Sequence, residues 1–207
     1  MSLINRRIHG RILEKKRRLD GHRPLPPVLV ARLRRELMIE YTYDSNAIEG
    51  STLTLRETRL VIEKGITIGG KSLKEYMGAR NHPEAIGFIE ELVKADREVD
   101  EEAVLHLHEL ILHGIDENAG RYRTSGVRIA GATFMPPPSR EVRPRILELL
   151  RWLKHNPDEL TPIETAAIFH HKFVCIHPFG EGNGRTARLL MNAILMEHGY
   201  PFIANIT

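Results

Sequence analysis

The 207-residue chain is long enough to form one domain with its own hydrophobic core, and its 42% hydrophobic content is typical of a soluble globular protein. The sequence has no apolar run that could span a bilayer, and residues 1–21 lack the apolar centre of a secretory signal peptide. Its one cysteine, Cys175, excludes an internal disulfide. We therefore expect a cytoplasmic protein that does not bind a membrane.

The net charge of +3 is small but unevenly distributed. Residues 1–40 hold 11 Lys and Arg against 4 Asp and Glu, whereas the remaining residues hold 19 against 23. A basic arm can attract nucleic acid or an acidic partner. No zinc-finger or RNA-recognition signature accompanies this charge, and few aromatic residues are interleaved with it. We interpret residues 1–42 as a basic helical arm with solvated faces and do not expect a nucleic-acid partner.

Helical periodicity dominates the first half of the chain. A proline-rich break at residues 22–27 precedes a predicted helix over 28–43. Thr54 and Glu57 have the spacing of a capping box, which opens a helix that Gly65 closes. Two further helices are predicted over 74–95 and 101–113. Pro83 lies inside the first of them and predicts a kink there, or two helices in place of one.

The pattern changes after residue 120. Val127 and Ile129 alternate with polar Arg128, so we predict a short β-hairpin over 122–135, which the three prolines at 136–138 end. Helical periodicity then returns over 140–155, 162–175 and 184–198, with Thr161 and Pro162 at the start of the second of these helices. The predicted fold is mostly α, with a central helix-loop-helix and one hairpin.

The loop of that helix-loop-helix carries the residue types of a phosphate site. Gly182 and Gly184 let backbone N–H groups converge on an anion, and the loop enters a helix N-terminus that favours phosphate. Arg185 and Arg188 are three residues apart and share a helix face, where each can grip phosphate oxygens.

Two further residue types complete the chemistry of this loop. Glu181 supplies a carboxylate for Mg²⁺, which binds one or two carboxylates together with substrate phosphates. His177 is a candidate general base near neutral pH. Each residue alone has a structural explanation, but packing does not require all of them within 12 positions. The loop therefore predicts phosphoryl-type transfer, which depends on positioning and charge neutralisation.

The segment from His177 to Arg188 resembles the signature His-x-Phe-x-(Asp/Glu)-Gly-Asn-Gly-Arg-x-x-Arg of the Fic (filamentation induced by cAMP) domain family at every fixed position. The similarity extends over residues 43–203 and is strongest to the animal endoplasmic-reticulum members, the class II type in which the inhibitory helix comes first. It implies a Fic-fold helical bundle over residues 43–207. In relatives, further helices with adenine-binding aromatic residues follow, so we expect this chain to be truncated at its C-terminus.

The resemblance implies a role for each residue of the loop. His177 would deprotonate a Ser, Thr or Tyr hydroxyl of a target protein, which would attack the α-phosphate of ATP. Glu181 would hold Mg²⁺ or Mn²⁺. An anion hole would be formed by Gly182, Asn183 and Gly184, Arg185 would bind the α- and β-phosphates, and Arg188 the γ-phosphate. Doc-type relatives carry a Lys in place of the second loop glycine and phosphorylate their targets, so Gly184 favours transfer of AMP.

A second segment, residues 43–50, resembles the inhibitory helix of the family through Ser45, Glu49 and Gly50. The resemblance implies that Glu49 pairs with Arg188 and keeps ATP out of its productive position. It also implies that Glu49 assists removal of AMP, the reverse activity. A helix C-terminus followed by a turn explains the same residues without any such role.

The remaining expectations concern partners and alternatives. Residues 122–135 resemble the family's flap, which would hold the target segment by strand addition. A second copy of the chain is a further candidate partner. His106, His108 and His113 do not share one helix face, and we do not expect a zinc site there. Two alternative functions stay open, namely a regulatory module that binds ATP without transfer and a Doc-like protein kinase toxin.

Overall fold

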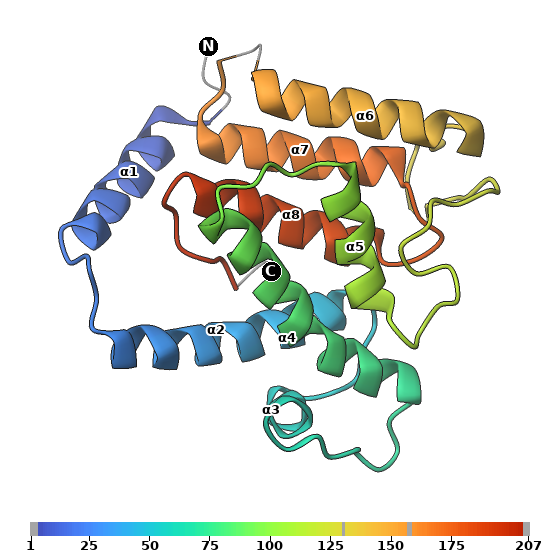
Figure 1. The fold of residues 1–207 in the computed structure, drawn as a ribbon, viewed down its shortest axis with the longest axis horizontal. Coiled ribbons are helices and arrows are strands. Elements are labelled where there is room, and N and C mark those ends of the chain that lie inside the picture. The colour runs from blue at the N-terminus through green and yellow to red at the C-terminus, as the bar shows by residue number, and fades with distance from the viewer. Residues whose placement is uncertain (1–3, 130, 157–158, 205–207) are drawn as a thin grey trace.

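The computed structural model describes residues 4–129, 131–156 and 159–204, and within these it forms eight helices (Figure 1). They are α1 (Arg6–Asp20), α2 (Pro27–Ile48), α3 (Leu55–Lys64), α4 (Leu73–Lys94), α5 (Glu101–Leu112), α6 (Ser139–His155), α7 (Pro162–Ile176) and α8 (Asn183–Glu197). No helix within these ranges combines the length and the apolar character needed to cross a membrane.

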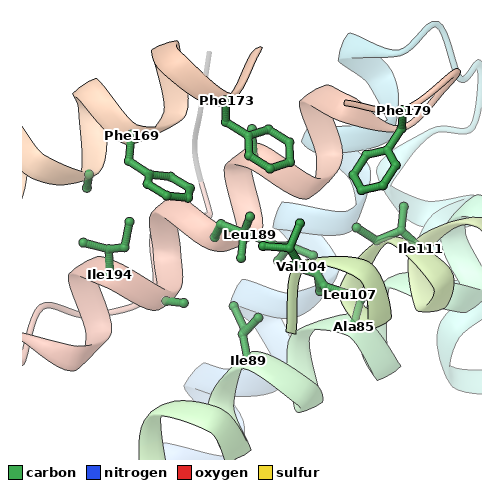
Figure 2. Close-up of a cluster of buried hydrophobic side chains, with 14 of the residues drawn as sticks. Ala85, Ile89, Val104, Leu107, Ile111, Phe169, Phe173, Phe179, Leu189 and Ile194 are labelled. Carbon is green, nitrogen blue, oxygen red and sulfur yellow. The ribbon is translucent and has the colours of Figure 1, made fainter. Parts of the chain in front are cut away.

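Helix α8 lies at the centre of the bundle. It packs along α7 and also contacts α4, α5 and α2, while α6 covers the other side of α7 (Figure 1). Aromatic residues of α7 and the loop after it point into the core beside aliphatic residues of α4, α5 and α8 (Figure 2). Phe169, Phe173 and Phe179 are completely buried there. The loop between α7 and α8 is therefore built on the most deeply packed pair of helices.

The helix starts agree with the local sequence signals. Capping boxes form at Thr54, Ser72 and Thr161, each with a glutamate three residues later whose side chain accepts from the cap backbone. Gly65 ends α3 in the left-handed conformation, with φ 64°. Helix α4 is a single helix of 22 residues with Pro83 inside it, so the two-helix alternative is wrong. Packing against α5, α8 and α2 holds α4 together across the proline.

The predicted β-hairpin is wrong for the part of it that the structure describes. No described residue between 122 and 135 lies in a strand, and Ala130 falls outside the described residues. The ends of this segment bond elsewhere, because Arg123 donates to the carbonyls of Ser125 and Pro137 and Ser139 donates to that of Thr124. These bonds replace the ladder that a hairpin needs, and the prolines at 136–138 supply no N–H groups for one.

Helix α2 is longer than the sequence predicted. It continues without interruption from Pro27 to Ile48, so the segment 43–50 forms its last turns and C-cap. The predicted boundary between the arm and the domain at residue 42 lies inside this helix. Its first half is exposed, and its second half, from Ile39 onward, enters the core. One continuous helix thus extends from the surface to the loop between α7 and α8.

Candidate functional site

The turn between α7 and α8 depends on two residues in the left-handed conformation. His177 caps α7 with φ 51°, a conformation that non-glycine residues adopt uncommonly. Gly182 precedes α8 with φ 76°, and a Cβ there would come within 2.8 Å of Leu112. Only glycine fits both the backbone angle and the close approach of α5.

A buried clasp closes the loop between these two residues. The side chain of Asn183 accepts from the backbone N–H of Phe179 and donates to its carbonyl, both at 2.9 Å. The Phe179 ring stacks on His108 of α5 with centroids 3.6 Å apart and planes 6° from parallel. Since Asn183 and Phe179 are both buried, the loop is held from inside the bundle.

His108 of α5 holds the loop through its ring. Its Nδ1 accepts from the backbone N–H of Gly120 at 2.9 Å, so the ring proton lies on Nε2, which is 3.0 Å from the carbonyl of Glu181. Burial lowers the pKa of His108 to about 4, against a smaller opposing effect of the Glu181 carbonyl. The ring is therefore neutral at pH 7 and has one fixed tautomer.

The candidate base, His177, is half-buried at the lip of the loop. Its Nδ1 lies 3.3 Å from the carbonyl of Val174, which can only accept, so a neutral ring carries its proton there and keeps a lone pair on Nε2. Burial is the main cause that lowers the pKa of His177. The carbonyl of Val174 and the carboxylate of Glu49 raise it, and the Arg123 guanidinium lowers it further. His177 has the protonation state of a base at neutral pH.

The N-terminus of α8 offers a place for an anion. The first N–H groups of a helix have no partner in a preceding turn, and no side chain caps this end of α8. Arg185 is 3% exposed, and its Nη2 donates to Glu181 Oε1 at 3.0 Å. Its Nε is buried and bonds to no other described residue. An unpaired donor of a buried guanidinium is the kind of group that a phosphate oxygen satisfies.

Glu181 is the only carboxylate of the loop. Its Oε1 lies 3.0 Å from Arg185 and 2.7 Å from the exposed amine of Lys74 on α4. A cavity of about 280 Å³ lies between these groups and the turn after α2. Its lining includes Glu49, Thr52, Lys74, Glu181 and Arg185.

The C-terminal end of α2 covers Arg188. Arg188 is 6% exposed, and its Nε donates to Ser45 Oγ at 3.0 Å. Nη2 donates to the Ser45 carbonyl at 2.9 Å and to Glu49 Oε1 at 2.8 Å. Gly50, with φ 90°, turns the chain away directly after Glu49.

Gly184 allows this closure. A Cβ at Gly184 would lie 2.6 Å from Glu49 Oε1 and 2.9 Å from Arg188 Nη1. The carboxylate of Glu49 is thus in contact with the first turn of α8, where an anion is favoured by the helix dipole. Glu49 occupies this position as an internal anion.

The structure brings together all the site residues that the sequence singled out. The loop from His177 to Arg188 faces the C-terminal end of α2, which carries Ser45 and Glu49. Sequence reasoning missed Arg123, whose buried side chain donates to the carbonyl of His177. It also treated His108 as an ordinary helix residue. Its position two residues from His106 was the available signal, because one of the two had to face the core.

Comparisons with known proteins show which family the chain resembles. The family model described as "Fic/DOC family" matches residues 98–195. The chain is 37% identical over 181 residues to "Protein adenylyltransferase Fic" of Nematostella vectensis, which covers 86% of this chain and 42% of that protein. It is 40% identical over 174 residues to "Protein adenylyltransferase fic-1" of Caenorhabditis elegans, covering 82% and 34%. The chain therefore spans less than half the length of these curated relatives.

A solved structure extends the likeness over nearly the whole chain. A Fic domain containing signaling protein from Bacteroides thetaiotaomicron superimposes with a TM-score of 0.84 at 32% identity. The superposition covers 94% of this chain and 75% of that one. The fold and the order of its elements are therefore shared with a relative of similar extent.

Proposed function

Because the chain belongs to the Fic/DOC family, we propose that it transfers AMP from ATP to a Ser, Thr or Tyr hydroxyl of a target protein. The observation that carries this proposal is that one short loop joins His177, as a neutral base, to the N-terminus of α8, which no side chain caps, and to the buried Arg185. A base, an anion site and a guanidinium with an unpaired donor are what nucleotidyl transfer needs.

In the proposed reaction, Nε2 of His177 takes the proton of the acceptor hydroxyl. The acceptor oxygen forms a bond to the α-phosphorus of ATP, the bond from that phosphorus to the bridging oxygen breaks, and pyrophosphate leaves. The N–H groups of Gly182, Asn183 and Gly184 bind the phosphate oxygens, together with Arg185. Arg188 binds the γ-phosphate once Glu49 has left it. One bond to the α-phosphorus forms and one breaks, and the proton of the hydroxyl passes to His177.

The residues present fit a divalent cation that is shared with the substrate. Glu181 is one carboxylate, and no group of three or more His, Cys, Asp or Glu residues within the described ranges could hold a metal alone. Mg²⁺ commonly binds one protein carboxylate together with phosphates. In the proposal, Glu181 holds Mg²⁺ or Mn²⁺, which neutralises phosphate charge, and Lys74 gives up its contact with Glu181.

We also propose that the protein is autoinhibited. Glu49 and the γ-phosphate would compete for Arg188, and the carboxylate of Glu49 already contacts the first turn of α8. ATP can then bind productively only after the end of α2 moves or Glu49 turns away. The same carboxylate, next to His177, would position a water for removal of AMP in the reverse activity.

The acceptor segment is proposed to bind along residues 124–138. The backbone groups of Gly126, Val127 and Arg128 bond to no other described residue, and the segment starts beside His177. An extended peptide can pair with such unpartnered groups, although the segment itself is not a hairpin. A protein acceptor, ATP and a second copy of the chain remain the proposed partners.

The position of the label in ATP tests this function. The full-length protein and its Glu49→Gly variant are incubated with cell lysate and ATP labelled on either the α- or the γ-phosphate. We expect α-label on proteins, increased about 5- to 150-fold by Glu49→Gly, the range of a coupling of 1–3 kcal/mol. The double variant Glu49→Gly, His177→Asn is the control and should transfer no label, because Asn tolerates the left-handed backbone but is not a base.

Each alternative gives a different result. Label from the γ-phosphate alone would replace the proposal with protein phosphorylation. ATP binding without any label, even in the Glu49→Gly variant, would indicate a regulatory module. If Glu49→Gly leaves both ATP affinity and labelling unchanged, the proposed competition for Arg188 is wrong.

A further inference from the structure

Arg123 is a buried cation with an unusual set of partners. It lies in the connection between α5 and α6, and 7% of the residue is exposed. Its side chain donates four hydrogen bonds, and every acceptor is a backbone carbonyl. No described carboxylate lies within ion-pairing distance of it. A buried guanidinium without a carboxylate costs desolvation energy, so its position calls for a role other than an ion pair.

Half of these bonds hold the end of α7. Nε of Arg123 donates to the His177 carbonyl at 2.7 Å, and Nη2 donates to the Ile176 carbonyl at 3.4 Å. The backbone N–H of Arg123 adds a bond to the Pro178 carbonyl at 3.0 Å. These are carbonyls at the C-terminus of a helix, where a cation is favoured by the dipole. They also surround the one loop residue, His177, that holds a left-handed backbone without being glycine.

The other half of the bonds hold both ends of the segment 124–138, in which most of the described residues are exposed. Nη1 donates to the Ser125 carbonyl at 2.8 Å, and Nη2 donates to the Pro137 carbonyl at 2.6 Å. One planar guanidinium therefore joins the entry and the exit of this segment to the backbone of the candidate base. Lysine, with a single ammonium group, cannot reproduce this fork of donors.

We propose that Arg123 is a positioning residue that fixes the His177 ring relative to the segment that receives the acceptor hydroxyl. The proposal rests on the function proposed above and adds to it a determinant outside the loop from His177 to Arg188. Arg123 acts through the backbone of its partners and touches no reacting atom. Its contacts lie on the acceptor side of His177, so its loss affects the acceptor and the chemical step more than the binding of ATP.

The charge of Arg123 gives a second readout. The charged groups that act on His177 are Arg123, which lowers its pKa, and Glu49 at the end of α2, which raises it. The Val174 carbonyl on α7 also raises the pKa, while burial lowers it. Removing the positive charge at position 123 makes the imidazolium more favourable. The acid limb of the pH–rate profile should then move to higher pH, because His177 must lose a proton to act as a base.

The test uses full-length protein in the Glu49→Gly background, with transfer of α-label to itself and to a lysate acceptor as the assay. Arg123→Met removes both charge and donors, and Arg123→Lys keeps the charge. For Arg123→Met we expect kcat to fall about 100-fold and the KM for ATP to stay within about 2-fold of the parent. The acid limb of its pH–rate profile should move to higher pH. For Arg123→Lys we expect a loss of at least about 10-fold in kcat with an unchanged acid limb.

A matched control separates positioning from stability. Leu149→Ala removes a buried side chain of α6, outside the loop from His177 to Arg188, and lowers the melting temperature while Arg123 keeps its side chain. If Leu149→Ala reduces kcat as much as Arg123→Met at an equal loss of stability, and the acid limb does not move in either, Arg123 is only structural and the proposal is overturned. If Arg123→Met does not fold, Arg123→Lys decides, and full activity in that variant overturns the proposal.

Failure of this inference can be told from failure of the proposed function. If the Glu49→Gly parent with its native Arg123 transfers no α-label, the function is wrong. If the parent transfers label and both Arg123 variants match it in kcat and in acceptor KM, the function stands and the positioning role is wrong.

Discussion

The loop from His177 to Asn183 and the segment 124–135 lie on either side of Arg123 and are built in opposite ways. The loop is closed by a side-chain clasp, stacked on α5 and mostly buried. In the segment, the exposed fraction is 43% for Phe134 and 64% for Met135. Much of the segment's backbone makes no hydrogen bond to another described residue. Groups that stabilise developing charge must be fixed beforehand, whereas a surface that receives varied peptides gains from unpaired groups. The difference supports the proposal that the loop carries the chemistry and that the segment receives the acceptor.

The largest expected effect comes from opening the clasp. Asn183→Ala removes both bonds to the Phe179 backbone and leaves two buried polar groups unpaired. We expect a loss of about 2–5 kcal/mol in the free energy of unfolding and about 100-fold in transfer. Urea unfolding and labelling measure the two. Asn183→Asp keeps the acceptor alone and serves as a partial control. Native-like stability of Asn183→Ala would show that the loop is not held by this residue.

A pH-dependent effect of intermediate size is expected from His108. Its pKa of about 4 in the folded protein is lower than its value of about 6.5 in the unfolded chain. The neutral ring therefore stabilises the fold fully above about pH 6.5, and this contribution is lost as pH falls toward 4. Between about pH 7.5 and pH 5 it amounts to about 2 kcal/mol.

The variant His108→Gln tests this pH dependence. It removes the titrating ring and keeps a donor and an acceptor, so its free energy of unfolding should fall less with decreasing pH than that of the native protein. Urea unfolding at several pH values measures the difference. Parallel pH dependences of variant and native protein would contradict the assigned protonation of His108.

The smallest effect on stability is expected in the segment 124–135. Phe134→Ser replaces a large exposed side chain and should change the free energy of unfolding by no more than about 0.5 kcal/mol. If this segment receives the acceptor, transfer to lysate proteins should fall while the KM for ATP is unchanged. Thermal unfolding together with labelling at several ATP concentrations measures both. A large loss of stability would mean that the segment is as tightly packed as the loop, and the contrast between them would disappear.

Much of the fold was predictable because its signals are local. Helix starts at Thr54 and Thr161 follow from side chains three residues apart, and these capping boxes are confirmed. The hairpin over 122–135 was predicted from alternation and turn residues, and it is wrong for the described residues of that segment. Whether such a segment pairs with itself depends on where its backbone groups find partners. Here Arg123 and Ser139, near its ends, take up the carbonyls of Ser125 and Thr124.

The candidate site was predictable to a similar degree. The loop residues lie within 12 positions of one another, and their chemical types favour phosphate binding without any knowledge of the fold. The role of Arg123 was not visible, because an isolated arginine in a polar stretch has no local signal. For His108 the spacing from His106 indicated only that one of the two rings faces the core. That its ring stacks on Phe179, about 70 residues later in the chain, had no local signal.

By itself, the sequence predicted most of the helices and their caps, and it favoured phosphate binding by the loop from His177 to Arg188, since each of these signals depends on residues a few positions apart. The family resemblance implied that Glu49 pairs with Arg188, a contact across 139 residues, and the structure contains that pair. Only the tertiary structure showed that Arg123 joins the backbone of His177 to the segment 124–138. The physical reason is that the partners of a buried charge are the polar groups that tertiary packing places next to it. Local periodicity carries no information about that arrangement.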